Sequence, residues 1–229
     1  MALPILNDTP KYTLTLPSTG ETYKFRPYLV KEEKVLLIAA QSEDQNMIMG
    51  AIHDVISACV ENIDVDTLTT FDLEYVFIQL RAKSVGETSQ ISVGCPSCGH
   101  KNGIVVDLNE VKVVKKEADP IIKISDDVTV EMKYPSYRDI QITDDQTTIG
   151  FNLVASGLKS VFYGDEKINI EDESHESVVA FLESMTQDQF AKITAWFDDS
   201  PVVKYDLTLN CKECKETNEI EIKGMQSFF

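Results

Sequence analysis

The sequence lacks the short motifs by which common catalytic sites are recognised. None of the patterns GxSxG, GxxxxGK[ST], GxGxxG and HExxH occurs among its 229 residues. The nucleophile elbow, the phosphate-binding loop, the dinucleotide-binding loop and the zinc-protease helix are therefore missing. Histidine occurs only three times, and both His53, among apolar helix residues, and His175, in an acidic helix start, are better read as structural or solvated than as bases. We expect a protein that is not an enzyme.

Basic residues are scarce as well. The chain has 21 Lys and Arg against 38 Asp and Glu, which gives a net charge of −17. Because contacts with phosphate require a basic surface, we expect no nucleic-acid partner. No apolar run approaches the ~18 residues of a membrane span, and the first eight residues lack the basic and apolar regions of a signal peptide. We therefore expect no membrane partner and a cytoplasmic protein.

Cysteine occurs five times, and four of the five form two matching motifs. These are Cys95-Pro-Ser-Cys98 and Cys211-Lys-Glu-Cys214, which align without a gap together with the residues after them. Each motif stands at the turn of an expected hairpin. Four thiolates are the ligand set of a closed, structural zinc site, so we predict that Cys95, Cys98, Cys211 and Cys214 bind one Zn²⁺. Ribbon motifs are usually about 15–20 residues apart, so this ribbon would carry an inserted domain.

Other interpretations of the cysteines are weaker. A thioredoxin-type CxxC motif would open a helix, whereas strand patterns follow both motifs here. Two disulfides would suit a secreted chain, and no secretory signal is present. His100, just after the first motif, could serve as a spare ligand. The fifth cysteine, Cys59, lies among Val55, Ile56 and Val60 and is expected to be a buried apolar side chain.

The hydrophobic pattern predicts an α+β fold. A β-hairpin is expected at residues 11–28, followed by helices between residues 30 and 86. The pattern then repeats in outline: it predicts a hairpin at 121–134, a helix at 148–161, helices at 174–182 and 186–197 and a strand from residue 202. The second of these late helices begins with the capping box Thr186-Gln-Asp-Gln189.

This repetition predicts two pseudo-repeated α+β halves joined by the zinc-ribbon-like four-cysteine site. The first half, residues 1–117, contains the N-terminal hairpin, the helices and the first CxxC motif. The second half, residues 118–229, contains the second motif. The apolar tail at residues 225–229 is expected either to pack back on the fold or to dock on a partner.

Several segments of the first 110 residues are similar to one known family. They are Met1-Ala-Leu-Pro4, the turn Leu16-Pro-Ser-Thr-Gly20, Phe25-Arg-Pro-Tyr28 with the following Leu-Val-Lys-Glu-Glu-Lys34, Phe71-Asp-Leu-Glu-Tyr75 and Arg81-Ala-Lys-Ser-Val-Gly86. Together they resemble the baseplate hub subunit family of T-even-type contractile-tailed bacteriophages. The later half follows this family in its order of elements and its closing CxxC motif.

The resemblance implies a viral protein that is needed to build the central hub of the tail baseplate. It implies synthesis and assembly in the host cytoplasm, with other hub and tail subunits as partners. The protein would be either a structural subunit of the virion or an assembly chaperone, and the oligomeric state is left open.

Two further functions are compatible with the sequence. A cytoplasmic zinc-ribbon adaptor would bind a polymerase or nucleic acid, which the negative charge disfavours. A metal-dependent hydrolase would use acidic pairs in the expected turns, namely Asp126-Asp127, Asp144-Asp145 and Glu171-Asp172. Asp is frequent in turns because it hydrogen-bonds to nearby backbone groups, so these pairs are better explained as turn residues.

Overall fold

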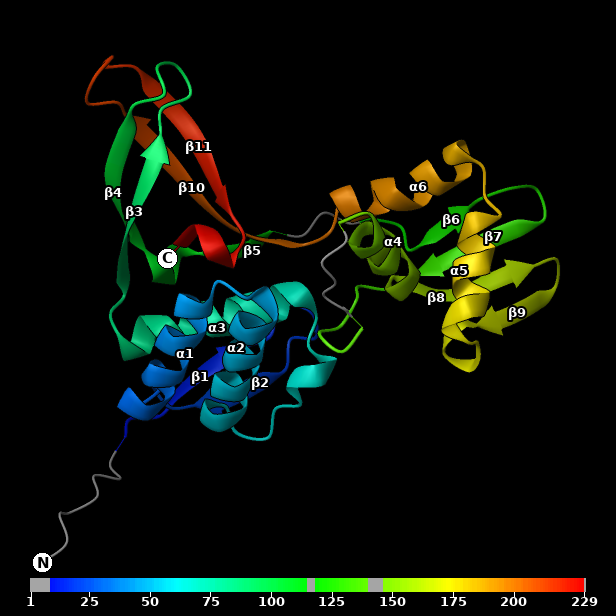
Figure 1. Cartoon of the computed structure of the whole chain (residues 1–229), viewed down its shortest axis with the longest axis horizontal. Coiled ribbons are helices and arrows are strands. Elements are labelled where there is room, and N and C mark those ends of the chain that lie inside the picture. Colours follow the sequence, from blue (N-terminus) through cyan, green and yellow to red (C-terminus); the bar gives the residue numbers. More distant parts are fainter. Residues whose placement is uncertain (1–8, 115–117, 140–145, 229) are drawn as a thin grey trace, which may run out of the picture. The chain divides into compact units, whose positions relative to one another are not determined.

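The computed structural model describes residues 9–114, 118–139 and 146–228 (Figure 1). The fold is mixed α+β, as the sequence predicts. The chain forms two compact units, each made from more than one segment. The first unit consists of Met1–Val65, Phe71–Val114 and Val202–Phe229, and the second of Asp66–Thr70 and Lys115–Pro201.

The C-terminal segment thus belongs to the same unit as the N-terminal one. This arrangement places both CxxC motifs in the first unit. The predicted halves, residues 1–117 and 118–229, were inferred from a repeat in the sequence, whereas the two units are defined by compactness in space. The predicted repeat therefore stays a prediction.

The first unit begins with the predicted hairpin. Strands β1 (Tyr12–Thr15) and β2 (Thr22–Phe25) pair antiparallel, from Tyr12↔Phe25 to Thr15↔Thr22. The connecting turn is closed by a hydrogen bond from the Gly20 backbone N–H to the carbonyl oxygen of Leu16 (2.9 Å). Gly20 has φ +76°, a conformation that glycine adopts without a Cβ penalty.

Three helices follow: α1 (Val30–Ser42), α2 (Gln45–Cys59) and α3 (Thr70–Ser84). In each of the first two, a carboxylate at the N-terminal end accepts a hydrogen bond from a free backbone N–H group. At α1, Glu32 accepts a hydrogen bond from the Leu29 N–H (2.7 Å), and at α2, Asp44 accepts one from the Asn46 N–H (2.8 Å). The inner faces of α2 and α3 supply fully buried apolar residues, among them Ile56, Val76, Ile78 and Leu80.

Two hairpins complete the first unit. One pairs β3 (Thr88–Gly94) with β4 (Lys101–Asp107), and the other pairs β10 (Val202–Asn210) with β11 (Thr217–Lys223). Strand β5 (Lys112–Val114) joins β10 on its other edge, so that Val114 pairs with Val202. The chain therefore leaves the first unit and returns to it through two neighbouring strands.

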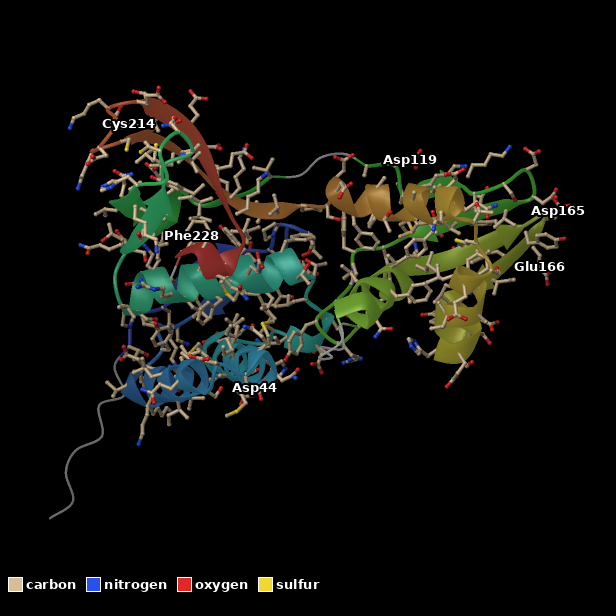
Figure 2. The ribbon with its side chains drawn as sticks, turned by 45° about the horizontal axis from the view of Figure 1, so that its top comes forward. Asp44, Asp119, Asp165, Glu166, Cys214 and Phe228 are labelled. Carbon is tan, nitrogen blue, oxygen red and sulfur yellow. The ribbon has the colours of Figure 1, made fainter. Side chains whose placement is uncertain are left out.

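The tail after β11 packs back on the first unit. Residues Met225–Phe228 form a short 3-10 helix in which Met225 and Phe228 are buried. The Ser89 hydroxyl of β3 donates a hydrogen bond to the carbonyl oxygen of Phe228 (2.6 Å), and Figure 2 labels this end of the chain at Phe228. Of the two alternatives predicted for the tail, the described residues 225–228 therefore pack back on the fold. Phe229 lies outside the described residues.

The second unit contains a four-stranded antiparallel sheet in the order β6-β7-β8-β9. Its strands are β6 (Ile121–Lys123), β7 (Val128–Met132), β8 (Leu158–Tyr163) and β9 (Glu166–Asn169). Helices α4 (Gln146–Ser156), α5 (His175–Glu183) and α6 (Gln187–Asp198) accompany the sheet. The predicted hairpin at 121–134 and the capping box of α6 are confirmed.

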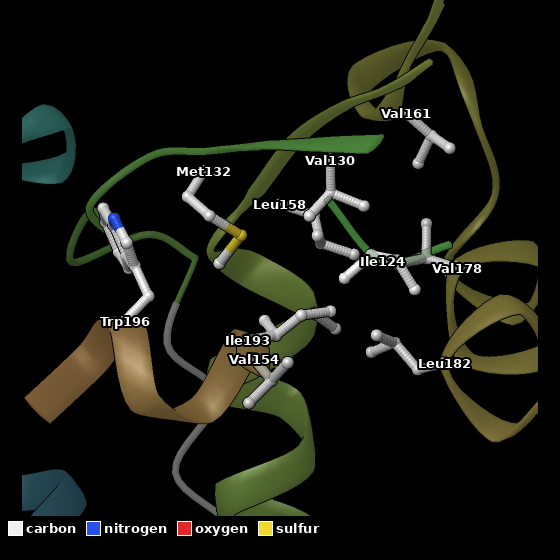
Figure 3. Packing of buried hydrophobic residues seen from close by; sticks show 11 residues of the cluster. Ile124, Val130, Met132, Val154, Leu158, Val161, Val178, Leu182, Ile193 and Trp196 are labelled. Carbon is white, nitrogen blue, oxygen red and sulfur yellow. The ribbon is translucent and has the colours of Figure 1, made fainter. Parts of the chain in front are cut away.

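One apolar cluster holds the second unit together (Figure 3). The sheet contributes Val130, Met132 and Leu158, and the helices contribute among others Ile193 and Trp196. Burying a side chain such as Leu158 completely stabilises the fold by roughly 1.5–3 kcal/mol relative to exposure.

The predicted helix at 148–161 is wrong at its C-terminal end. Helix α4 ends at Ser156, and Leu158–Tyr163 is strand β8. The change occurs at Gly157, whose carbonyl oxygen accepts a hydrogen bond from the Lys133 backbone N–H (2.8 Å). A Cβ on Gly157 would overlap the ring of Phe197, so only glycine fits this junction without a shift.

Within the described residues no helix is both long and apolar enough to cross a membrane.

Candidate metal centre

The candidate metal centre lies where the turns of two hairpins meet. The first CxxC motif connects β3 with β4, and the second connects β10 with β11. Figure 1 shows the two hairpins side by side with their turns at the same end, and Figure 2 marks this end at Cys214. Alternating strand residues place each turn in the same way, because the hairpin registers run without a shift up to Gly94↔Lys101 and Asn210↔Thr217.

The two turns have the same backbone hydrogen bonds. The Cys95 N–H donates to the carbonyl oxygen of His100, and the Cys211 N–H donates to that of Glu216, both at 2.9 Å. The residue after each second cysteine has a positive φ, +76° at Gly99 and +64° at Lys215. The matched sequences therefore fold into matched structures, although Lys215 adopts a left-handed conformation that costs a non-glycine residue roughly 1 kcal/mol.

The four sulfur atoms converge. The distance from Cys95 Sγ to Cys214 Sγ is 3.7 Å, and that from Cys98 Sγ to Cys211 Sγ is also 3.7 Å. All four sulfurs lie within 4.8 Å of one another. Four sulfurs placed tetrahedrally, each about 2.3 Å from a Zn²⁺, would be about 3.8 Å apart. The cluster thus has the spacing that a tetrahedral ion requires, and it can bind a metal ion.

Each turn contributes one buried and one exposed cysteine. Cys95 and Cys211 are buried, whereas Cys98 and Cys214 are exposed. Backbone N–H groups of Cys214 and Glu213 stabilise the Cys211 thiolate and lower its pKa to about 6. The pKa of Cys95 is also lowered, because the N–H groups of Cys98 and Ser97 outweigh the effect of burial.

The exposed cysteines behave in the opposite way. Backbone N–H groups favour both thiolates, but desolvation and hydrogen bonds with other sulfurs of the cluster outweigh them. The pKa of Cys98 is therefore raised, and that of Cys214 is raised to about 12. Because like charges repel, four thiols this close together do not all lose their protons unless a cation is bound. The cluster therefore favours binding of a positively charged ion at neutral pH.

The remaining sequence candidates do not join the cluster. Cys59 is buried in α2, and burial raises the pKa of its thiol to about 11, which agrees with the predicted apolar role. His100 contributes its backbone carbonyl to the first turn, and its side chain is not part of the convergent group. Among the described residues, the acidic turn pairs form no comparable group either. The pair at residues 144 and 145 lies outside them.

The sequence patterns predicted no function for two residues that lie next to the cluster. Asn102 and Asn218 lie four residues after the second cysteine of each motif, and their side-chain amides approach sulfur atoms. Their matched positions in the two aligned motifs were the signal that could have identified them.

Comparisons with known proteins give one match. A family model described as "T4 bacteriophage base plate protein" matches residues 9–229. A search of the curated proteins gave no match, and neither did a search of the solved structures.

Proposed function

Because the chain belongs to the T4 bacteriophage base plate protein family, we propose that it helps to build the central hub of the baseplate, without catalysing a reaction. It does so through contacts with other hub and tail subunits in the host cytoplasm. A structural Zn²⁺ at Cys95, Cys98, Cys211 and Cys214 holds the contact-forming unit in shape.

The assignment to the hub rests on the resemblance of the first 110 residues to hub subunits. The segments with this resemblance that fall among the described residues lie in the hairpin β1–β2 and in helices α1 and α3. Met1–Pro4 lies outside them. The resemblance thus includes the start of α1, a helix with several exposed apolar side chains.

An apolar surface on this helix is the observation that supports protein–protein contact. Large apolar side chains are exposed at 12 positions among the described residues, and six of these fall between residues 29 and 47. We call these six the α1 surface: Val30, Val35, Leu37 and Ile38 of α1, Leu29 just before it, and Met47 in the first turn of α2. Exposed apolar side chains gathered in one part of a fold are typical of a surface that another protein covers.

The chemistry of the α1 surface favours a protein partner. Val30 is 79% exposed and Leu37 is 58% exposed, and covering such side chains removes apolar area from water. Two lysines, Lys31 and Lys34, are exposed on the same helix of a chain with net charge −17. A partner subunit with an apolar groove and carboxylates at its edge would match this surface.

The metal has a structural role in this proposal. Four cysteines fill the coordination sphere of Zn²⁺, so no position is left open for a substrate or an activated water. The ion instead links residues 95–98 with residues 211–214 and thereby closes the first unit.

The test combines mass spectrometry of purified phage particles with pull-downs of this protein from infected cells. Recovery in both, with baseplate proteins, would identify a subunit of the virion, and recovery in the pull-downs alone would identify an assembly chaperone. If this protein is absent from the particles and its pull-down recovers no baseplate proteins, the hub assignment is refuted. In that case the cytoplasmic zinc-ribbon adaptor becomes the better proposal.

A surface variant makes the test specific. We expect Leu37→Gln combined with Ile38→Gln to lose the baseplate proteins from the pull-down and to keep the wild-type melting temperature. The control combines Val85→Gln with Val105→Gln, two positions of matching exposure outside the α1 surface. Equal recovery with both double variants would rule out the α1 surface as the contact.

A further inference from the structure

Asn102 connects the first CxxC turn to the second. Its Oδ1 accepts a hydrogen bond from the backbone N–H of Lys212 (3.0 Å). A backbone N–H can only donate, so this contact fixes the orientation of the amide. The Nδ2 group therefore faces the other way, where it donates to the carbonyl oxygen of His100 (3.0 Å) and to Cys211 Sγ (3.7 Å).

Asn218 makes the reverse connection. Its Oδ1 accepts a hydrogen bond from the hydroxyl of Ser97 (3.2 Å), which belongs to the first turn. Its Nδ2 donates to Cys95 Sγ (3.6 Å). Each asparagine thus binds the opposite turn twice, once through its oxygen and once through its nitrogen.

The two amides act on the two sulfurs that water reaches least. Cys95 is 3% exposed and Cys211 is 2% exposed, whereas Cys98 and Cys214 are open to solvent. Four thiolates around a dication carry a net charge of −2, and a buried charge needs hydrogen bonds to replace its lost hydration. Water can supply them at the exposed sulfurs, and at the buried sulfurs the asparagine amides add to the backbone donors.

We propose that Asn102 and Asn218 are positioning residues of the metal centre. Each aligns the opposite turn, and its amide stabilises the buried thiolate there, so the pair raises the affinity for the metal. The proposal rests on the four-cysteine site of the proposed function.

Asparagine suits this role better than the side chains of similar or smaller size. An aspartate at either position would keep the acceptor for Lys212 or Ser97, but it would place a negative oxygen against the sulfur. An alanine would lose both contacts. Hydrogen-bond partners of metal ligands typically change metal affinity 10- to 100-fold when they are replaced.

The test compares three variants of the full chain: Asn102→Asp, Asn218→Asp and the control Asn210→Asp. Asn210 directly precedes Cys211 and is exposed, and its Oδ1 accepts a hydrogen bond from the Thr217 hydroxyl (2.7 Å). An aspartate keeps that bond, so the control adds the same charge near the site without removing an amide from a sulfur.

Zinc affinity is measured by competition with a chelator, and the sulfur-to-metal charge-transfer band is measured after substitution with Co²⁺. We expect Asn102→Asp and Asn218→Asp to weaken zinc binding 10- to 100-fold. The charge-transfer band should move to longer wavelength, because a sulfur without its N–H partner gives up an electron more easily. Asn210→Asp should change affinity less than threefold and leave the band in place.

The outcomes separate the two levels of the argument. If the wild type binds neither zinc nor Co²⁺, the four-cysteine site itself fails. If the wild type binds and both asparagine variants keep its affinity and band position, only the role of the asparagines fails. Weaker binding without a band shift would mean that the residues merely support the fold, and it would also overturn the proposal. Asn102 is buried, so if Asn102→Asp does not fold, the more accessible Asn218→Asp decides.

Discussion

Removing the metal should loosen the first unit and leave the second unit unchanged. The cysteines of the cluster come from turns 113 residues apart, as in the pair Cys98 and Cys211. All four belong to the first unit, and the second unit contributes none. A metal that links the two turns therefore restricts the unfolded chain in the same way as a cross-link.

The size of the effect depends on which other contacts close the loop. Lys112 of β5 pairs with Lys204 of β10, which leaves roughly 20 residues between this pair and the sulfurs, a loop whose closure is worth about 3 kcal/mol. If the β5–β10 pairing also fails without metal, the full 113-residue loop is worth about 5 kcal/mol. About 3 kcal/mol is therefore the smallest loss of stability that we expect.

Amide hydrogen exchange is the suitable assay because it reports each segment separately. A loss of about 3 kcal/mol corresponds to exchange that is about a hundredfold faster. We expect this acceleration at the Cys95 and Cys211 amides and along β10 and β11 after chelation, and equally in a Cys98→Ser variant. Amides of β7 and β8 in the second unit should keep their rates and serve as the internal control.

The result that would refute the reasoning is equal protection of both hairpins with and without bound metal. Elemental analysis must show that the wild type carries about one zinc per chain before chelation and none afterwards. Faster exchange in both units would contradict the restriction of the effect to the first unit.

Two further predictions concern the second unit. Gly157→Ala should destabilise the protein by roughly 1–3 kcal/mol in urea unfolding, because the new Cβ overlaps the Phe197 ring. Adding Phe197→Leu to this variant should recover part of the loss. The control Gly150→Ala, in open space within α4, should be neutral or stabilising. The pKa of Glu131 is lowered to about 2, chiefly by its hydrogen bond with Lys159. Its contribution to stability is therefore present above about pH 4.5 and is lost as the pH falls towards 2, so Glu131→Gln should flatten the acid unfolding curve followed by circular dichroism; an unchanged curve would mean that this carboxylate does not contribute.

The sequence predicts those parts of the fold that are set by local pattern. The hairpins and the capping box of α6 were predicted because turn residues, caps and alternation act over a few residues. The cysteines were found in the same way, since two identical spacings with matched flanks indicate a shared structure. Their convergence in the structure agrees with the prediction, and their role as zinc ligands stays a proposal.

The errors arose where distant contacts decide the structure. Residues 158–161 are apolar and fit either a helix or a buried strand, and the contact of Gly157 with Phe197 is formed between residues that lie far apart in sequence. The pairing of Val114 with Val202, which joins two segments of the first unit, likewise depends on residues far apart in sequence, and no local pattern indicates it. The asparagines were missed because their role depends on which sulfur each amide meets in space.

Because the first unit is discontinuous, its segments are synthesised at different times. A ribosome completes the first CxxC turn 113 residues before Cys211, which at about 5–20 residues per second is a delay on the order of ten seconds. During this interval the thiols of Cys95 and Cys98 have no partner cysteines, while the larger segment of the second unit, Lys115–Pro201, is synthesised. Residues 202–229, which are synthesised after the second unit, are the ones that complete the first unit. A nascent chain that stops before Cys211 lacks two of the four cysteines, so the candidate metal centre can form only after the second CxxC motif has been made.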